Sequence, residues 1–298
     1  MTESMITQSG YAAIIGRPNV GKSTLLNALI GEKISITSAK PQTTRCQILG
    51  IKTREHAQII YIDTPGLHRE ETRAINRYMN RVASSVIHDT DVIVFLIDAT
   101  RYQEEDELVL QKLKSTDKPI ILALNKIDLL SEKEKLLPLI EKLKNKLNFI
   151  KIIPISAMKK ENIDTLENEI ITLLPEGSLL FPEDQLTDKN MRFHAAEIIR
   201  EKLVRETEQE LPYATTVEIE QFKQDDRLTE ISAIIWVERP GQKVIIIGKD
   251  GARLKRIGMQ ARRDIEKLVD TKVFLRLWVK VKERWTDDDQ LLRNLGYE

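Results

Sequence analysis

The chain has 298 residues, which exceeds the size at which a single hydrophobic core is usual, so its length predicts two domains. Hydrophobic residues make up 41% and charged residues 31% of the chain, a balance that excludes a disordered or fibrous protein. Lys plus Arg and Asp plus Glu number 46 each, so the bulk charge indicates no polyanionic partner, and any nucleic-acid site must come from local clustering.

The single cysteine, Cys46, excludes an intramolecular disulfide framework and is typical of a reducing compartment. No apolar run approaches the ~20 residues that a membrane-spanning helix needs. The first ten residues lack the basic and apolar regions of a signal peptide. A cytoplasmic location is therefore predicted.

The first half of the chain alternates short apolar runs with amphipathic stretches, which predicts a doubly wound α/β domain whose parallel sheet is covered on both faces. The expected strands are 11–15, 47–52, 58–63, 91–98, 119–125 and 151–155. The expected helices, each with an apolar face at spacing three or four, are 22–30, 75–87, 104–113, 131–147 and 163–173.

Helix breakers among polar residues follow the last of these helices, and they predict a linker over 176–190. The linker separates a domain over 1–175 from a smaller α+β domain over 191–298. The elements expected in the second domain are a helix at 191–209, strands at 214–222 and 230–237, a helix at 252–269 and a strand at 272–282.

A phosphate-binding motif joins the first expected strand to the first expected helix. Gly16-Arg-Pro-Asn-Val-Gly-Lys-Ser23 fits G-x-x-x-x-G-K-[ST] in the strand-to-helix context that a P-loop requires. Its glycines let backbone N–H groups surround phosphates, Lys22 reaches the β- and γ-phosphates, and Ser23 binds Mg²⁺. The alternative interpretation is an ordinary glycine-rich turn before a helix. The two motifs described next argue against it.

Asp63-Thr-Pro-Gly66 and Asn125-Lys-Ile-Asp128 each close a further apolar strand. Asp63 can hold the Mg²⁺ shell and the Gly66 N–H can meet the γ-phosphate. The Asp128 carboxylate only accepts hydrogen bonds, so it suits the N1–H and exocyclic amine of guanine, whereas adenine would leave it unpaired. The motifs therefore predict GTP over ATP. The turn Ser156-Ala157 after the last strand could support the base.

This set of motifs resembles the translation-factor-related small GTPases, and Lys40-Pro-Gln-Thr-Thr-Arg45 is similar to the first switch region of the Era-like branch. The resemblance covers the whole chain. It implies that Thr44 binds Mg²⁺ only when the γ-phosphate is present, so that its segment orders with GTP and loosens with GDP.

Three further residues bear on hydrolysis. Small GTPases commonly carry a water-orienting Gln after the D-x-x-G glycine, but this chain has Leu67, which cannot hydrogen-bond water, so slow intrinsic hydrolysis is predicted. His68 is interpreted as a surface residue of the switch loop, with a role as a base as the alternative. Related GTPases imply that Asn19 helps to hold an activating K⁺ ion; the alternative is a turn-forming Asn.

The expected site follows from these motifs and the resemblance together. The residues expected in catalysis are Lys22, Thr44, Gly66 and Asn19. The expected ligands of Mg²⁺ are Ser23, Thr44 and Asp63. The residues expected to bind GTP or GDP are Gly16, Arg17, Pro18, Asn19, Val20, Gly21, Lys22, Ser23, Thr24, Asp63, Thr64, Pro65, Gly66, Asn125, Lys126, Asp128, Ser156 and Ala157.

A second glycine motif, G-x-x-G at Gly248–Gly251, follows an apolar run and opens the helix expected at 252–269. Six basic residues and one acidic residue lie between Val244 and Arg263, so a local positive patch exists in a neutral chain. The loop resembles that of a KH domain, which clamps about four nucleotides of single-stranded RNA. The alternative is a glycine turn between helices with a solvated basic face. The expected RNA-binding residues are Gly248, Lys249, Asp250, Gly251, Arg253, Lys255 and Arg256.

The element order α-β-β-α-α-β around this loop resembles the bacterial-type (type II) KH fold, and both halves together are similar to the Era family. The resemblance implies binding to the 3′ end of small-subunit (16S) ribosomal RNA during assembly of the small ribosomal subunit. It also implies a monomer, with peripheral attachment to the cytoplasmic face of the inner membrane. The end of the chain from Trp278 to Trp285 alternates like a strand, and Trp278 is predicted to lie in the core and not to stack on bases.

Three functions remain open at this point: a GTP-controlled RNA-binding assembly factor, a GTPase accessory to RNA modification, and a membrane-surface signalling GTPase with a protein-interaction module. The sequence shows no modification site, metal cluster or lipidation motif in favour of the second or third. The first is the predicted function.

Overall fold

The structure is a computed structural model that describes residues 8–38, 40, 43–66, 73–207 and 211–295. The chain divides into two compact units, and the second begins at Lys189 and takes in two short earlier segments. Each unit has its own sheet and its own hydrophobic core. The fold class predicted from the sequence, a doubly wound α/β unit followed by a smaller α+β unit, is confirmed.

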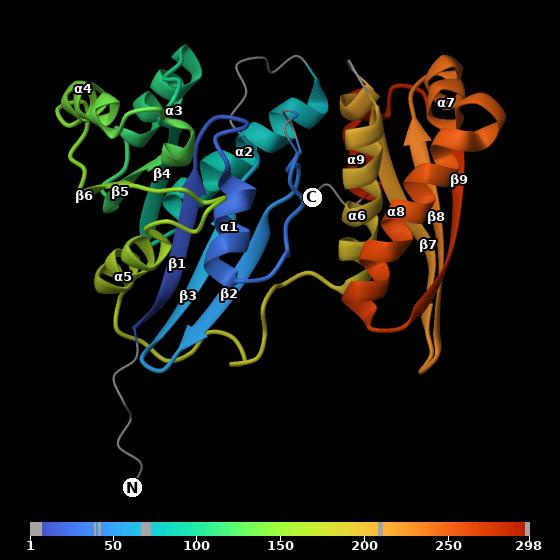
Figure 1. The fold of residues 1–298 in the computed structure, drawn as a ribbon, viewed down its shortest axis with the longest axis horizontal. Helices are drawn as coiled ribbons and strands as arrows, with labels where there is room; N and C mark the ends of the chain where they lie inside the picture. The colour runs from blue at the N-terminus through green and yellow to red at the C-terminus, as the bar shows by residue number, and fades with distance from the viewer. Residues whose placement is uncertain (1–7, 39, 41–42, 67–72, 208–210, 296–298) are drawn as a thin grey trace, which may run out of the picture. The chain divides into compact units, whose positions relative to one another are not determined.

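The first unit is built on a six-stranded sheet in the order β2-β3-β1-β4-β5-β6 (Figure 1). The strands are β1 (Gln8–Ile15), β2 (Ile48–Arg54), β3 (Ala57–Asp63), β4 (Val92–Asp98), β5 (Ile120–Asn125) and β6 (Lys151–Pro154). The neighbouring described strands pair in parallel, with the exception of β2, which runs antiparallel to β3. The prediction of a parallel sheet was wrong for this edge, because Glu55 and His56 form a turn too short for the crossover that a parallel pair needs.

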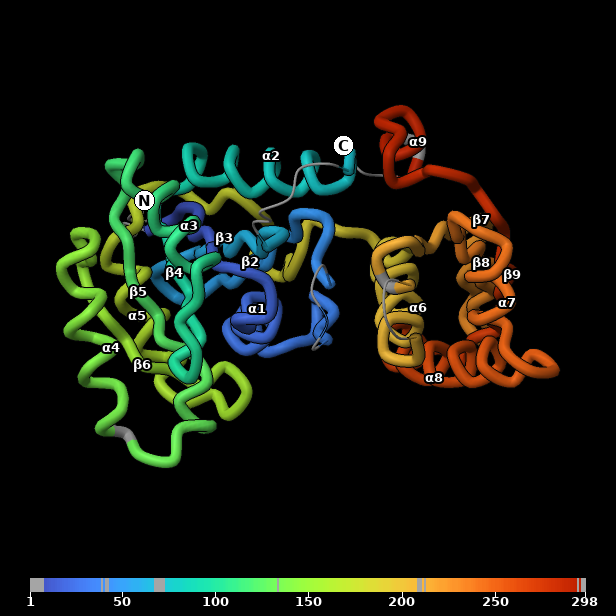
Figure 2. Tube along the Cα trace, turned by 90° about the horizontal axis from the view of Figure 1, so that it is seen from above, coloured from blue at the N-terminus to red at the C-terminus, as the bar shows by residue number. Residues whose placement is uncertain are grey.

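Helices cover both faces of this sheet (Figure 2). They are α1 (Lys22–Ile30), α2 (Ala74–His88), α3 (Glu104–Leu113), α4 (Leu136–Leu143) and α5 (Ile163–Leu173). The helix expected at 131–147 is shorter, with a separate 3₁₀ turn at Lys133–Lys135 before α4. Pro138 explains the break, because its ring would clash with a carbonyl one turn earlier in a continuous helix.

The central strands β3, β4 and β5 are buried along their whole length, as expected when helices cover both faces of a sheet. Phe95 of β4 lies in a cluster with Leu110 of α3 and Leu122 of β5. Because β1, β3, β4 and β5 run parallel, the polar residues that follow them meet at one edge of the sheet. That edge is where the candidate site forms.

Part of the segment expected to be a linker packs along the first sheet. Glu176 forms a β-bridge with Gln8, Thr187 forms one with Gly50, and the Ile51 N–H donates to the Leu186 carbonyl at 2.9 Å. The chain therefore follows the first unit as far as Asp188, where the division between the units falls.

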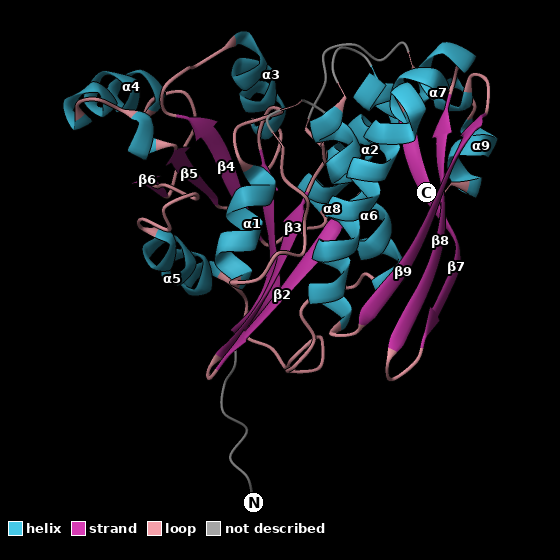
Figure 3. Cartoon of the chain, turned by 45° about the vertical axis from the view of Figure 1, so that its right-hand side comes forward, coloured by secondary structure: helices cyan, strands magenta, loops and turns pink. Residues whose placement is uncertain are grey.

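The second unit has the order α-β-β-α-α-β expected from the sequence, followed by one short helix. Its elements are α6 (Met191–Glu206), β7 (Thr215–Gln224), β8 (Leu228–Val237), α7 (Pro240–Ile247), α8 (Ala252–Val269), β9 (Lys272–Val281) and α9 (Asp289–Asn294). The sheet order is β7-β8-β9, with β7 antiparallel and β9 parallel to β8. Helices α6 and α8 lie together on one side of this sheet (Figure 3).

Strand alternation decides what the second sheet buries. Alternate residues of β8 and β9, such as Ile231 and Val273, pack against Ile199 of α6 and Ile265 of α8. Trp278 has the opposite phase and is 42% exposed, so the prediction that it lies in the core was wrong. None of the described helices is long and apolar enough to cross a membrane.

Candidate nucleotide site and nucleic-acid interface

The loop Gly16–Ser23 joins β1 to α1 and is closely packed. Asn19 and Gly21 adopt positive φ values of 64° and 105°. A Cβ on Gly16 would lie 2.5 Å from the Leu96 carbonyl oxygen, and one on Gly21 would lie 2.4 Å from the Asn125 side-chain nitrogen. These two glycines are therefore required by close approach, and the loop leads directly into the N-terminus of α1, a position that favours phosphate.

The Lys22 ammonium spans this loop. Its Nζ donates to the carbonyl oxygens of Gly16 and Arg17, each at 2.9 Å. Burial lowers the pKa of Lys22 to about 8, although the Asp63 carboxylate opposes the shift. A phosphate beside this amine would favour its charged form.

Ser23, Thr44 and Asp63 lie together at the start of α1. The Ser23 hydroxyl donates to Asp63 Oδ2 at 2.7 Å and lies 2.7 Å from the Thr44 hydroxyl, which lies 3.4 Å from the same carboxylate oxygen. Asp63 Oδ1 is buried and has no hydrogen-bond partner among the described residues. Burial raises the pKa of Asp63, with Lys22 and the hydroxyl groups opposing. Two hydroxyls and a carboxylate with one unsatisfied oxygen fit Mg²⁺, which prefers oxygen ligands.

The Arg17 side chain turns away from the loop interior toward α3. Its Nε donates to Asp106 Oδ2 at 2.9 Å, and a second nitrogen donates to the Arg101 carbonyl at 3.0 Å. Asp106 is fully buried and also accepts from the Gln103 N–H at 2.8 Å at the start of α3. Arg17 therefore anchors the loop through its side chain, and only its backbone is available to phosphate.

The turn after β3 packs against the phosphate loop. The Thr64 hydroxyl donates to the Ile14 carbonyl at 3.0 Å. A Cβ on Gly66 would lie 2.8 Å from the Pro18 ring, so glycine is needed where the two loops meet. Leu67 and His68 lie outside the described residues, and the slow hydrolysis inferred from Leu67 stays a prediction.

Asn125, at the end of β5, ties two loops together. Its side-chain nitrogen donates to the Val20 carbonyl at 2.8 Å, and its side-chain oxygen accepts from the Ala157 N–H at 2.9 Å. Asn125 is buried, and its role in the structure is to hold the turn at Ser156–Ala157 in register with the phosphate loop.

Lys126 and Asp128 follow in the same turn. Lys126 has a φ of 68°, and its Nζ donates to the Asn19 carbonyl at 2.8 Å and to Asp98 at 2.6 Å. The Ser156 hydroxyl donates to the Asp128 carboxylate at 2.5 Å. The exposed Asp128 carboxylate is thus oriented by the turn at Ser156–Ala157, which was predicted from the sequence to support the base.

Sequence reasoning missed Asp98 and Asp106. Burial acts to raise the pKa of Asp98, but hydrogen bonds from Lys126 and Thr100 outweigh it and the pKa is lowered. Asp98 closes β4 as Asp63 closes β3, and that position after an apolar strand is the signal that could have found it. Asp106 had no comparable signal, because its partner Arg17 lies 89 residues earlier.

In the second unit, the loop Gly248–Gly251 has the unusual backbone that the motif requires. The φ values are 72° at Gly248, 50° at Asp250 and 74° at Gly251. A Cβ on Gly248 would lie 2.8 Å from that of Arg253, whereas the space beside Gly251 is open. Lys249 and Asp250 are exposed, so a ligand can approach the backbone here.

An open groove of about 380 Å³ leads away from this loop between α8 and β9. Leu275 and Leu277 line one side, and Met259 and Arg262 line the other, together with Lys255. Sequence reasoning missed all of these except Lys255. Gly258 also lines the groove, and a Cβ there would lie 3.4 Å from Leu277 and would take up part of its space.

Both of the expected RNA-binding arginines are engaged within the unit. Arg256 pairs with Glu206 of α6 at 2.7 Å, and Arg253 donates to the Ile245 carbonyl at 2.6 Å. The structure therefore brings Lys249 and Lys255, but not the Arg256 side chain, toward the loop and groove.

These observations define a class of protein. A phosphate loop, an oxygen cluster suited to Mg²⁺ and an oriented Asp128 make the first unit a P-loop GTPase, and the second unit has the KH fold. In agreement, residues 11–126 match the family described as 50S ribosome-binding GTPase, and residues 210–286 match the KH domain family.

Comparison with known proteins narrows the class. The chain is 54% identical to GTPase Era of Ectopseudomonas mendocina and 54% identical to GTPase Era of Pseudomonas entomophila, covering 100% of this chain and 99% of each relative. A crystal structure of Era in complex with MgGDPNP and nucleotides 1506–1542 of 16S ribosomal RNA is 43% identical, with a TM-score of 0.94 over 98% of this chain and 99% of that one. A variant of Aquifex aeolicus Era bound to GDP·AlF4⁻ is 42% identical, with the same TM-score and coverage. The chain belongs to the Era family of GTPases.

Proposed function

We propose that this GTPase is a GTP-controlled RNA-binding protein that acts in assembly of the small ribosomal subunit. The observation that carries the proposal is the presence of two complete sites in one chain: the loop and turns around Lys22 and Asp128, and the positive-φ loop at Gly248–Gly251. The RNA-bound Era structure described above supports the 3′ end of 16S ribosomal RNA as the ligand.

At the nucleotide site, backbone N–H groups between Gly16 and Ser23 bind the phosphates, and Lys22 neutralises them. Ser23, Thr44 and Asp63 hold Mg²⁺, which supplies charge neutralisation for the leaving and transferred phosphates. Thr44 links this cluster to the segment that responds to the γ-phosphate. Asp128, oriented by Ser156, pairs with the guanine edge.

We propose K⁺ as an activating ion near Asn19. Asn19 has a positive φ of 64°, and its carbonyl accepts a hydrogen bond from Lys126. This fixed backbone holds the exposed Asn19 side chain at the phosphate loop, where it can reach an ion beside the phosphates. Hydrolysis that is faster in K⁺ than in Na⁺ is expected, and equal rates would rule the ion out.

At the RNA site, the backbone of the Gly248–Gly251 loop clamps the strand, and Lys249 and Lys255 contact its phosphates. Control by GTP requires that RNA bind the two nucleotide states with different affinity. The domain assignment that goes with this function is the GTPase domain over 1–175, the linker over 176–190 and the KH domain over 191–298.

The proposed cellular setting is a cytoplasmic monomer with peripheral attachment to the inner membrane, of which the monomer and the attachment rest on the family resemblance. Size-exclusion chromatography tests the monomer, and co-sedimentation with anionic lipid vesicles tests the attachment. Elution at the volume of a dimer would contradict the monomer. Protein that stays in the supernatant when the vesicles are pelleted would contradict the attachment.

Substitution of the loop glycines tests the RNA site. Replacing Gly248 and Gly251 with Asp adds two anions where the strand must approach, so RNA affinity should fall by roughly a hundredfold or more while GTP affinity is unchanged. Binding is measured by fluorescence anisotropy with a labelled single-stranded RNA from the 3′ end of 16S rRNA.

Gly241→Asp is the matched control, because an added Cβ there meets nothing within 4 Å. It should bind RNA nearly as well as the parent. If the double variant loses GTP binding as well, the loop is a structural turn. Lys255→Glu is a second test that places no side chain at a positive φ. If this variant loses RNA affinity and keeps GTP affinity, the RNA site is supported even where the double glycine variant is misfolded.

A further inference from the structure

The face of the β7-β8-β9 sheet turned away from α6 and α8 carries large aromatic side chains. Along β9, Val273 and Val279 are buried on the helix side, whereas Phe274 and Trp278 are 47% and 42% exposed. Two residues of the same phase, Arg276 and Lys280, are also exposed. A sheet face that only meets water has no need of exposed aromatic residues.

Strand β8 adds a third aromatic ring to the same face. Trp236 pairs in register with Lys280 of β9, so its side chain lies on the same side of the sheet as Trp278. The Trp236 Nε1–H donates to Glu218 at 2.7 Å, which fixes the ring. The three rings therefore occupy one continuous surface, defined here as the outer face.

Cations lie beside the aromatic rings of the outer face. The Arg276 guanidinium is 4.7 Å from the centroid of the Phe274 ring, and the Lys280 and Lys282 ammonium groups are 5.9 Å and 5.3 Å from that of Trp236. Lys280 also lies 3.6 Å from the Glu220 carboxylate. Together with Lys272 at the start of β9, four cations face the three nearby carboxylates of Glu218, Glu220 and Glu230, so the balance is positive by one. Rings with interleaved cations are the pattern of a surface that binds single-stranded nucleic acid.

The outer face is continuous with the groove that carries the proposed RNA site. Strand β9 is the edge of its sheet, and Leu275 and Leu277 on its helix side line the groove with α8. Phe274 and Trp278 alternate with these leucines on the opposite side of the same strand. A strand of RNA that leaves the groove has only to pass around one edge strand to reach the rings.

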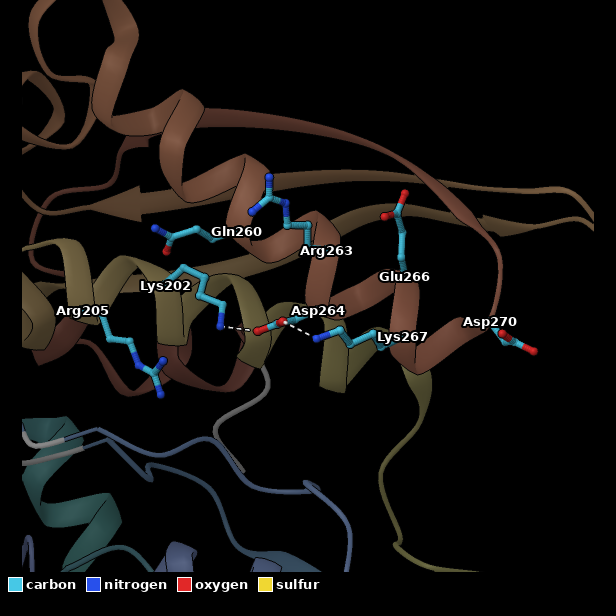
Figure 4. Close-up of a pocket in the computed structure, with 8 residues that line it drawn as sticks. All are labelled: Lys202, Arg205, Gln260, Arg263, Asp264, Glu266, Lys267 and Asp270. Atoms are coloured by element: carbon cyan, nitrogen blue, oxygen red, sulfur yellow. Dashed lines mark hydrogen bonds and ion pairs between the residues drawn. The ribbon is translucent and has the colours of Figure 1, made fainter.

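A larger hollow of about 700 Å³ between α6 and α8 does not offer such a surface (Figure 4). Some of its charges are paired within the hollow: Lys202 bonds Asp264, and Lys267 lies 3.9 Å from the same carboxylate. Arg205 pairs with Glu201 at 2.8 Å. Four cations and three acids line the hollow, so its charges nearly cancel and it has no strong field for a polyanion or a polycation.

We propose that the outer face is a second RNA contact, on which Phe274, Trp278 and Trp236 stack with bases of the strand that continues from the α8–β9 groove. Arg276, Lys280 and Lys282 contact its phosphates. The proposal rests on the RNA-binding function proposed above, and it extends the RNA footprint beyond the roughly four nucleotides that a KH loop clamps.

The test compares RNA lengths. Full-length protein and the variant Phe274→Ala/Trp278→Ala are titrated with RNAs of roughly 6 and roughly 14 nucleotides from the 3′ end of 16S rRNA, the shorter one filling only the loop and groove. Loss of two stacking partners should weaken binding of the longer RNA roughly tenfold or more and leave the shorter one unchanged. GTP hydrolysis should also be unchanged.

Controls make the outcome specific. Met191→Ala removes a side chain of α6 that is 45% exposed in the same unit, and should alter neither affinity. The single variant Trp278→Phe keeps an aromatic ring at this position. It should therefore bind the longer RNA much more tightly than the double alanine variant does. Unchanged affinity of the double variant for the longer RNA overturns the proposal and leaves the face to a protein partner, and equal losses for both lengths overturn it as well. If the parent protein binds neither RNA, the proposed function itself fails.

Discussion

Asp128 is the residue that we propose selects the base at the nucleotide site, because its carboxylate can only accept hydrogen bonds. Ser156 holds the carboxylate at 2.5 Å, so the residue is oriented before any nucleotide arrives. Asp128→Asn should lower GTP affinity by roughly tenfold to a hundredfold, because an amide presents a donor to the guanine N1–H.

Competition titration with GTP and xanthosine triphosphate measures this change, and the variant should prefer the xanthine nucleotide. The control is Asp164→Asn, since the Asp164 side chain is 91% exposed and lies away from the site. Parent-like GTP affinity in Asp128→Asn would contradict the assignment of the base-recognition residue.

The lowered pKa of Lys22 should make nucleotide binding depend on pH. Its pKa is lowered to about 8, chiefly by burial, and bound phosphate favours the ammonium form and raises the pKa again. Binding is therefore strongest when Lys22 is already protonated, below about pH 8, and weakens as the pH rises through that value. Between pH 6.5 and 8.5, affinity for GDP measured by calorimetry should fall about fourfold.

Lys22→Met, which cannot titrate, provides the control for this measurement. Its weaker binding should lack the fourfold change. A parent protein whose affinity stays constant across the window would show that the loop does not hold Lys22 in the buried position seen here.

Some residues of the two sites could be predicted from the sequence and others could not. The glycines of both loops were predictable because their spacing is tied to the backbone conformation they must adopt. The partner of Lys126 was not, because Asp98 lies 28 residues away and only the packing of β4 beside β5 brings them together. Trp278 was misplaced although the phase was visible, since it shares its side of the strand with Arg276 and Lys280.

At the scale of elements, α3 is joined to the phosphate loop by a buried ion pair. The side chains of Arg17 and Asp106 are 9% and 0% exposed, and burial raises the pKa of Asp106 while its hydrogen bonds oppose the shift. Asp106→Ala would leave the Arg17 cation buried without its partner, which destabilises a protein by about 3 kcal/mol.

Thermal unfolding of the nucleotide-free protein should show that loss in the transition of the first unit, and GDP affinity should fall because the loop is no longer anchored. Asp117→Ala, an exposed carboxylate just after α3, is the matched control. A variant at Asp106 as stable as the one at Asp117 would mean that the pair does not hold the loop.

Most elements could be predicted because apolar periodicity alone fixes them, and α1, α3, α5 and α8 have the bounds expected from the sequence. Strand direction could not be read from periodicity, since β2 is apolar whichever way it runs, and only its short connection to β3 sets it antiparallel. The expected helix began too early, because Pro138 fits the first turn of α4, which starts at Leu136, but would clash with a carbonyl of a preceding helical turn.

In the whole molecule, the proposed function requires that the GTP site control an RNA site in the same chain. Each unit is complete in itself, with its own sheet, core and binding loop. Coupling between two such sites is a free energy that must appear reciprocally in both affinities, and it is typically about 1–3 kcal/mol.

The most direct measurement is the affinity of the full-length protein for single-stranded RNA from the 3′ end of 16S rRNA, determined once with GDP and once with a non-hydrolysable GTP analogue. RNA affinity should differ at least about fivefold between the two nucleotides, and RNA should change the affinity for the nucleotides by the same factor. Equal affinity in the two states would contradict control by GTP, and no binding in either state would contradict the RNA-binding function itself.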